Sequence, residues 1–177
     1  MIAYPSGQEP DFWDPMPSEH GHRFALGNLS RASIATPPLI VIGMNPSRAR
    51  EDRSDRTVNR IIAASEHHGY AGWLMLNLYP ERSPKPSALG PFDQSLADAN
   101  KQAIGNLLTQ FAASEVLGAW GNLPHPTLRR AWQDVLSMLA VRGVRVFTFD
   151  PLTKSGYPRH PNPQGGYLEM VGPKSYL

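Results

Sequence analysis

The chain contains no cysteine, few charged residues and no long apolar run, and each absence excludes a class of protein. Without cysteine there can be no disulfide framework, thiolate metal site or cysteine nucleophile. The apolar runs are too short to cross a bilayer, and residues 1–13 lack both the basic and the apolar region of a signal peptide. We therefore expect a cytoplasmic protein with no membrane partner.

The sequence motifs of several common enzyme classes are also missing. The chain has no Gly-x-x-x-x-Gly-Lys-Ser/Thr loop and no Gly-x-Gly-x-x-Gly turn, which argues against an ordinary kinase, ATPase or dinucleotide enzyme. No set of histidine and acidic residues has the spacing of a metal site, so we expect neither a metal nor another cofactor. Gly-x-Ser-x-Gly is absent too, although Ser47, His160 and Asp150 could still form a hydrolase triad.

The residues that are present favour one folded domain. The chain has 177 residues, of which 41% are hydrophobic, so it can bury a core of its own. Proline interrupts both helices and sheets, and four prolines within residues 1–21 predict an irregular N-terminal arm. Residues 22–177 are expected to form a single α/β domain with an irregular C-terminal tail, and we favour a monomer.

Apolar runs alternate with amphipathic stretches along this domain. Runs typical of strands buried on both faces cover residues 38–44, 73–79, 115–120 and 144–149. Residues 22–29 alternate like a half-buried strand at a sheet edge. Helical spacing follows the expected caps Asp55 and Ser95, and again Pro126. This order predicts a three-layer α/β/α sandwich around a mainly parallel central sheet of about four strands.

Polar residues follow the apolar runs, at the edge where parallel α/β sheets bind ligands. They are Asn45 and Ser47, then Asn77, then Trp120, Gly121 and Asn122, and finally Asp150, Thr153, Lys154 and His160. Asparagine and glycine also end strands for structural reasons, so one of them alone indicates little. Their repetition after four runs predicts a cleft. The long proline-rich loop over residues 80–93 adds to it, because long loops in compact domains tend to be functional.

Cationic residues gather in two places, although the formal net charge of +2 is too small to indicate nucleic acid. Five arginines lie within residues 48–60, interleaved with three acidic residues. They form either a phosphate-binding edge, in which Arg60 would hold a phosphate, or a solvated loop and helix face. Lys154 and Arg159, near His160, form either an anion-binding corner or an ordinary loop.

Seven short motifs stand in a fixed order along the chain. They are Arg23…Leu26, Asn45-Pro46-Ser47, Asp55-x-Thr57-x-x-Arg60, Gly69-Tyr70, Asn77-Leu78, Trp120-Gly121 and Thr153-Lys154-x-Gly156-x-Pro158-x-His160-Pro161. Their spacing resembles a bacterial and phage family known only as a domain of unknown function, number sixteen forty-three. The resemblance covers about residues 22–161 and implies no established activity.

A second resemblance rests on four of these landmarks. The segments are Gly43-Met44-Asn45-Pro46, Leu76-Asn77, Trp120-Gly121 and His160-Pro161-Asn162-Pro163. Their order resembles the uracil-DNA glycosylase superfamily, in which the first motif holds the hydrolytic water and the asparagine reads the edge of the base. The resemblance implies a glycosylase-like α/β/α fold, DNA repair as the setting, and DNA or a nucleotide as the partner.

Cleavage of a base from deoxyribose needs a positioned water, a reader of the base edge and a donor aimed at the developing negative charge. The resemblance gives these roles to Asn45, Asn77 and His160, so that Asn45 and His160 are the catalytic pair. An amide orients water but is no general base, which predicts slow or absent turnover. The other expected substrate-binding residues are Gly43, Met44, Pro46, Ser47, Tyr79, Trp120, Gly121, Lys154 and Arg60. The stacking ring is expected to be Tyr79 or Tyr70.

Three functions therefore stay open at the level of sequence. The first is a nucleobase- or nucleotide-binding protein that hydrolyses the N-glycosidic bond of a base in DNA. The second is a non-catalytic nucleic-acid or nucleotide-binding module that keeps the pocket. The third is a hydrolase of another small molecule, with Ser47 as its nucleophile.

Overall fold

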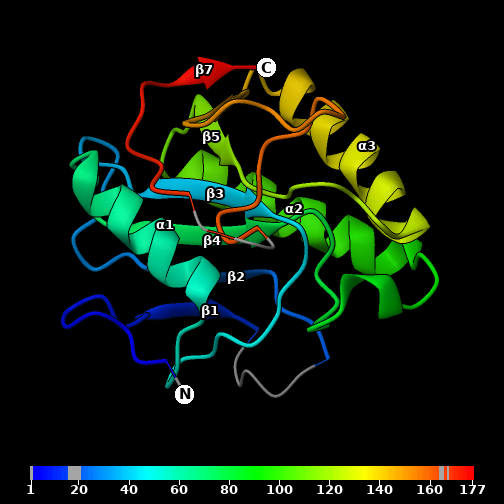
Figure 1. Ribbon diagram of the computed structural model, residues 1–177, viewed down its shortest axis with the longest axis horizontal. Helices are drawn as coiled ribbons and strands as arrows, with labels where there is room; N and C mark the ends of the chain where they lie inside the picture. The colour runs from blue at the N-terminus through cyan, green and yellow to red at the C-terminus, as the bar shows by residue number, and fades with distance from the viewer. Residues whose placement is uncertain (1, 16–20, 164–165, 167) are drawn as a thin grey trace.

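The computed structural model describes residues 2–15, 21–163, 166 and 168–177 and has one seven-stranded sheet at its centre (Figure 1). In chain order the strands are β1 (Phe12–Asp14), β2 (Ala25–Asn28), β3 (Leu39–Gly43), β4 (Trp73–Asn77), β5 (Glu115–Gly118), β6 (Arg145–Thr148) and β7 (Ser175–Tyr176). The helices are α1 (Arg56–His67), the short 3₁₀ helix η1 (Pro86–Ala88), α2 (Gln94–Gln110) and α3 (Pro126–Val141).

The sheet is mixed, with the order β1-β2-β4-β3-β5-β6-β7. The pairs among β4, β3, β5 and β6 are parallel, whereas β1 with β2, β2 with β4, and β6 with β7 are antiparallel. The prediction of a mainly parallel sheet of about four strands is therefore wrong for the sheet as a whole. It covered the strands joined by crossover helices and the flanking strand β2, and it missed the other flanking strands, β1 and β7, which have too few residues for a periodic pattern.

Two of these flanking strands lie in segments that were expected to be irregular. β1 belongs to the 1–21 arm, where the stretch between Pro10 and Pro15 is long enough to pair with β2; residues 1 and 16–20 of that arm lie outside the described residues. β2 is therefore not at the edge of the sheet, and it is buried on both faces rather than alternating. β7 forms from the tail and pairs with β6.

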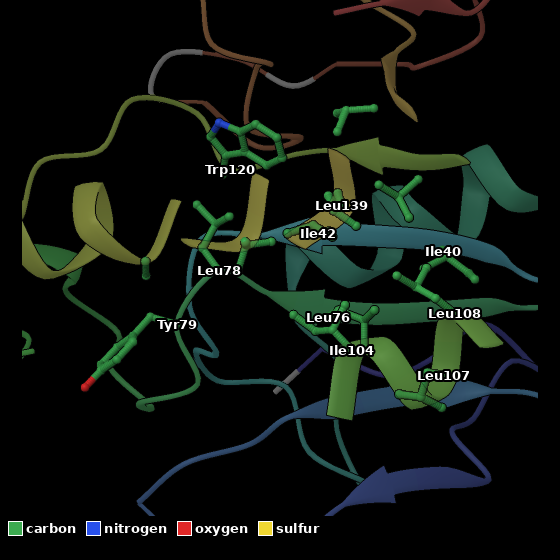
Figure 2. Close-up of a cluster of buried hydrophobic side chains, with 14 of the residues drawn as sticks. Ile40, Ile42, Leu76, Leu78, Tyr79, Ile104, Leu107, Leu108, Trp120 and Leu139 are labelled. Atoms are coloured by element: carbon green, nitrogen blue, oxygen red, sulfur yellow. The ribbon is translucent and has the colours of Figure 1, made fainter. Parts of the chain in front are cut away.

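Helices cover both faces of the sheet and produce three layers. Alternate side chains of β3 point to opposite faces, as the period of a strand requires. Leu39 and Val41 pack with the buried side of α1, whereas Ile40 and Ile42 pack with α2 and α3. Figure 2 shows the second of these clusters, in which Ile104 lies against the sheet. The two clusters thus hold the sheet between two helical layers. The helices cover the faces of the sheet and not the ends of its strands, where a ligand could bind.

The helix boundaries follow the capping residues. Asp55 caps α1 as predicted, because its Oδ1 accepts a hydrogen bond from Val58 N at 3.0 Å. α2 is capped by Asp93, whose Oδ1 accepts from Leu96 N at 3.0 Å; the expected cap Ser95 already lies inside the first turn. Within the described ranges, no helix has both the length and the apolar character needed to cross a membrane.

The order of the parallel strands reverses at the centre of the sheet. From β3 the chain passes through α1 to β4 on one side, and from β4 it returns through α2 to β5 on the other side of β3. In open α/β sheets this switch point leaves a crevice beyond the carboxyl ends of the two strands. The segments that follow β3 and β5 begin at Met44 and Ala119, but the pocket at this edge lies on the other side of β3, beyond β3 and β4, and no residue of the 119–125 segment lines it.

Candidate functional site

A pocket of about 350 Å³ lies beyond the carboxyl ends of β3 and β4. We call it the Asn77 pocket. Five predicted site residues line it: Met44, Asn45, Ser47, Asn77 and His160. The remaining lining residues are Arg23, Asp55, Thr57, Val58, Met75, Ser83, Pro84, Pro86 and Asn162. The fold therefore brings together both predicted catalytic residues and the predicted reader of the base edge.

Asn77 is the last residue of β4 and has no exposed surface. Neither its Oδ1 nor its Nδ2 has a hydrogen-bond partner among the described residues. Gly43 stands opposite it in the parallel register, and a Cβ atom at Gly43 would lie 3.2 Å from Oδ1 of Asn77 and would clash with the methyl group of Met75. Glycine at position 43 therefore makes room for a buried amide that the protein itself leaves unsatisfied.

Asn45 is held by the long loop that follows β4. Its Nδ2 donates to the carbonyl oxygens of Pro46 (3.1 Å), Glu81 (3.3 Å) and Ser83 (2.9 Å). Because the amide nitrogen is occupied, Oδ1 is the atom of Asn45 that remains to accept a bond from water or a ligand. The 80–93 loop contributes Ser83, Pro84 and Pro86 to the lining, so it takes part in the site.

The tail carries His160 to the pocket by packing on the segment after β5. Gly121 N donates to Pro158 O at 2.9 Å, and Gly121 has a φ of +67°. A Cβ atom at Gly121 would lie 3.0 Å from Cβ of His160, so the close approach depends on glycine. The imidazole Nδ1 accepts from Asn162 N at 3.2 Å, which leaves the proton of the neutral ring on Nε2.

Burial makes His160 pH-sensitive, because desolvation lowers the pKa of its imidazole below the ordinary value of 6.5. The unfolded chain then binds the proton more readily, so His160 stabilises the fold fully above pH 6.5 and loses this contribution as the pH falls through the folded-state pKa. We expect His160→Gln to reduce the slope of the unfolding free energy against pH in the range below pH 6.5, as measured by urea denaturation at several pH values. An unchanged slope between the two proteins would show that His160 titrates as it does in the unfolded chain.

Arg23 is a site residue that the sequence analysis did not place in the pocket. Its side chain is 4% exposed, its Nη1 donates to Ala49 O at 2.6 Å and its Nε has no partner among the described residues. Burial, followed by the nearby charge of Arg82, lowers the pKa of Arg23 to about 10. The guanidinium is therefore still a cation at neutral pH, enclosed beside the pocket.

A second pocket, of about 580 Å³, adjoins the first, and four of its nine described lining residues are arginines. We call it the arginine pocket. Its arginines are Arg48, Arg50, Arg53 and Arg82, and its other lining residues are Ile2, Ser47, Ser54, Asp55 and Pro84. Arg50 and Arg53 lie on one tight turn, in which Arg50 N donates to Arg53 O at 2.8 Å. Arg60 lies elsewhere, in a third pocket with Arg56, Asn59 and Asn162.

The other predicted site residues do not line the Asn77 pocket. Tyr79 is buried in the core against Phe92, with its hydroxyl accepting from Asp93 N at 3.0 Å, and Trp120 is buried in the same cluster (Figure 2). Lys154 is exposed. Gly43, Pro46 and Gly121 support the pocket through their backbones or close packing. Neither of the expected stacking rings lines the pocket.

The pocket offers amides, hydroxyl groups, a neutral imidazole, a buried guanidinium and the carboxylate of Asp55, which already accepts from the backbone N–H groups of Ala49 and Val58. Among the described residues, no group of three or more histidine or acidic side chains could hold a metal ion. A triad of Ser47, His160 and Asp150 does not form, because Nδ1 of His160 accepts a backbone N–H and has no proton to donate to a carboxylate. Asp150 does not line the pocket either.

Comparison with known proteins gives one match. A family described as a protein of unknown function, DUF1643, matches residues 23–162, which include every residue of the Asn77 pocket. No curated protein and no solved structure matches the chain. The matched segment is well over half of the 177 residues and confirms the first resemblance drawn from the sequence. The protein belongs to the DUF1643 family.

Proposed function

We propose that this protein binds the nucleobase of a nucleotide in the Asn77 pocket. The observation that carries the proposal is the amide of Asn77, which is fully buried and whose two polar atoms have no hydrogen-bond partner in the part of the chain that the structure describes. An amide presents a donor and an acceptor side by side, the pair that reads the hydrogen-bonding edge of a base. Each buried polar atom left unpaired costs about 1–3 kcal/mol, which a matching ligand would recover.

The pocket has the size and adaptability that a base requires. Its volume of about 350 Å³ lies at the lower end of the range for small-molecule sites. Met44 and Met75 line it beside Asn77, and methionine side chains are flexible enough to move aside as a ligand edge reaches the amide. Because neither expected stacking residue lines the pocket, these thioethers and the imidazole of His160 would contact the face of the base.

The same pocket supports hydrolysis of an N-glycosidic bond as the activity. Oδ1 of Asn45 would orient a water toward C1′, and the Nε2–H of neutral His160 would donate to the base as it leaves. The oxygen of water bonds to C1′ while the C1′–N bond breaks, the electron pair departs with the base, and the proton lost by water passes to solvent. The motif order shared with the uracil-DNA glycosylase superfamily adds support, and slow turnover is predicted because the residue that orients the water, Asn45, is an amide and not a general base.

The test is release of free base from end-labelled oligonucleotides and from free nucleotides that carry uracil, hypoxanthine or thymine. The native protein is compared with Asn45→Ala and His160→Ala, each shown to be folded by circular dichroism. We expect release by the native protein and a loss of about 10²-fold or more in each variant, the scale typical of positioned water and charge stabilisation. Base binding without release from any substrate would instead favour the non-catalytic module.

A further inference from the structure

We propose that the arginine pocket binds the phosphate chain of a free nucleoside polyphosphate whose base lies in the Asn77 pocket. This inference rests on the proposed function and adds the substrate class to it. The two pockets share Ser47, Asp55 and Pro84 in their linings, so they are neighbouring compartments of one recess. A ligand with a base at one end and a compact anion at the other would span both.

Arginines outnumber acidic residues in the lining of the arginine pocket, although Glu51 and Asp52 lie in the same 48–53 segment as three of them. Four guanidinium groups line it, whereas its one acidic lining residue, Asp55, already accepts from Val58 N and Ala49 N. Asp52 forms an ion pair with Arg53 at 3.6 Å, but the Asp52 side chain is 66% exposed and therefore strongly screened by water. A guanidinium group can donate two parallel hydrogen bonds to two oxygens of one phosphate, so a lining of arginines is suited to phosphate.

Arg82 gives an independent indication of a missing anion. Its Nη2 donates to Ala49 O at 3.2 Å, whereas its Nη1 has no exposed surface and no partner among the described residues. Burial, followed by the positive charge of Arg50, lowers the pKa of Arg82, although Glu51 opposes this effect. Neighbouring cations and an unsatisfied buried N–H both cost the fold free energy, and a bound phosphate would satisfy that donor and offset the repulsion.

The concentration of these charges favours a free polyphosphate over a polynucleotide. A nucleic-acid strand carries one negative charge per phosphodiester and is held by cations spread along its path. A triphosphate instead carries its charges on one short chain. The arginines converge on a single recess, and three of them come from the 48–53 segment.

Isothermal calorimetry on the intact protein tests this inference with four kinds of probe. They are the common deoxynucleoside triphosphates including dUTP, the matching nucleosides, inorganic tripolyphosphate, and a single-stranded oligonucleotide. We expect at least one triphosphate to bind 10-fold or more tightly than its nucleoside, and Arg50→Gln combined with Arg53→Gln to remove that difference. Arg130→Gln, which changes an exposed arginine on α3, is the matched control and should leave binding unchanged.

Each result separates this inference from the proposed function. Tripolyphosphate binding that needs Arg50 and Arg53, in a protein that does not distinguish bases, would support the arginine pocket and overturn base reading. Equal affinity for nucleoside and triphosphate, with binding that depends on Asn77, would support base reading and overturn the phosphate site. A single-stranded oligonucleotide that binds more tightly than every triphosphate, through Arg50, would overturn the choice of a free nucleotide.

Discussion

Asn77→Leu is expected to abolish base binding, by 100-fold or more in Kd, without destabilising the fold. Leucine has the same branching, although its two methyl groups are larger, and it brings no polar atoms, so it removes two buried groups that have no partner among the described residues. We expect the free energy of unfolding to stay constant or to rise by about 1–2 kcal/mol. Calorimetric titration with nucleotides and urea unfolding measure the two effects on the same sample.

A neighbouring asparagine supplies the matched control. Asn100 on α2 is also fully buried, but its Nδ2 donates to the carbonyl oxygens of Asn77 (2.9 Å) and Leu78 (3.2 Å). Asn100→Leu leaves both carbonyls without that donor and should cost about 2 kcal/mol or more of stability. If Asn77→Leu destabilised the protein as much as Asn100→Leu does, the amide of Asn77 would be structural and the proposed function would lose its main support.

The sequence predicts some residues of the site correctly and places others wrongly, as a comparison of Asn77 with Tyr79 shows. Asn77 follows an apolar run, and the rule that ligands bind beyond the carboxyl ends of parallel strands pointed to it directly. Asn45 and His160 were found in the same way, and the structure places both in the same pocket as Asn77. Tyr79 comes two residues after Asn77, but its side chain lies in the core. Once a strand has ended, the path of the loop decides where a side chain points, and the alternation of the strand no longer predicts it.

Arg23 was missed because its position depends on an antiparallel pair. β2 runs opposite to β4, with Ala25 paired to Leu76, so the residues before β2 lie beside those after β4. Arg23 N accordingly donates to Pro80 O at 2.8 Å. A sequence pattern shows that a strand exists, but its direction relative to its neighbours is set by packing along the whole sheet. The sequence therefore does not predict that the residues before β2, Arg23 among them, lie beside the pocket.

Strand β1 and the arginine pocket were hard to predict for a related reason. Three residues carry too little pattern to distinguish a strand from an extended arm, and the pairing of β1 with β2 is a long-range contact. The arginine run was recognised, yet its five members divide between two pockets. Arg82, which completes the first pocket, comes from the loop after β4 and stands far from the run in the sequence.

Asp55→Ala is expected to lower the free energy of unfolding by about 3 kcal/mol, through three separate losses. The variant loses the cap of α1 at Val58 N, about 1 kcal/mol, and the bond from Ala49 N, about 1 kcal/mol. It also removes a negative charge that favours the charged form of buried Arg23. This loss should destabilise the fold further, because a buried cation without a compensating negative charge is costly. Urea unfolding monitored by tryptophan fluorescence measures the total.

Two further variants separate the helix cap from the charge. Asp55→Asn keeps an oxygen for Val58 N and drops the charge, so it should cost about 1 kcal/mol less than Asp55→Ala. In a chain that also carries Arg23→Met there is no buried cation at position 23 to balance, and Asp55→Asn should cost less than it does in the native chain. Strictly additive costs would mean that Asp55 acts only as a cap and that Arg23 is stabilised by Ala49 O alone. A coupling of about 0.5 kcal/mol or more would instead assign Asp55 a second role, because the residue that begins α1 would also keep a cation charged at the wall of the Asn77 pocket.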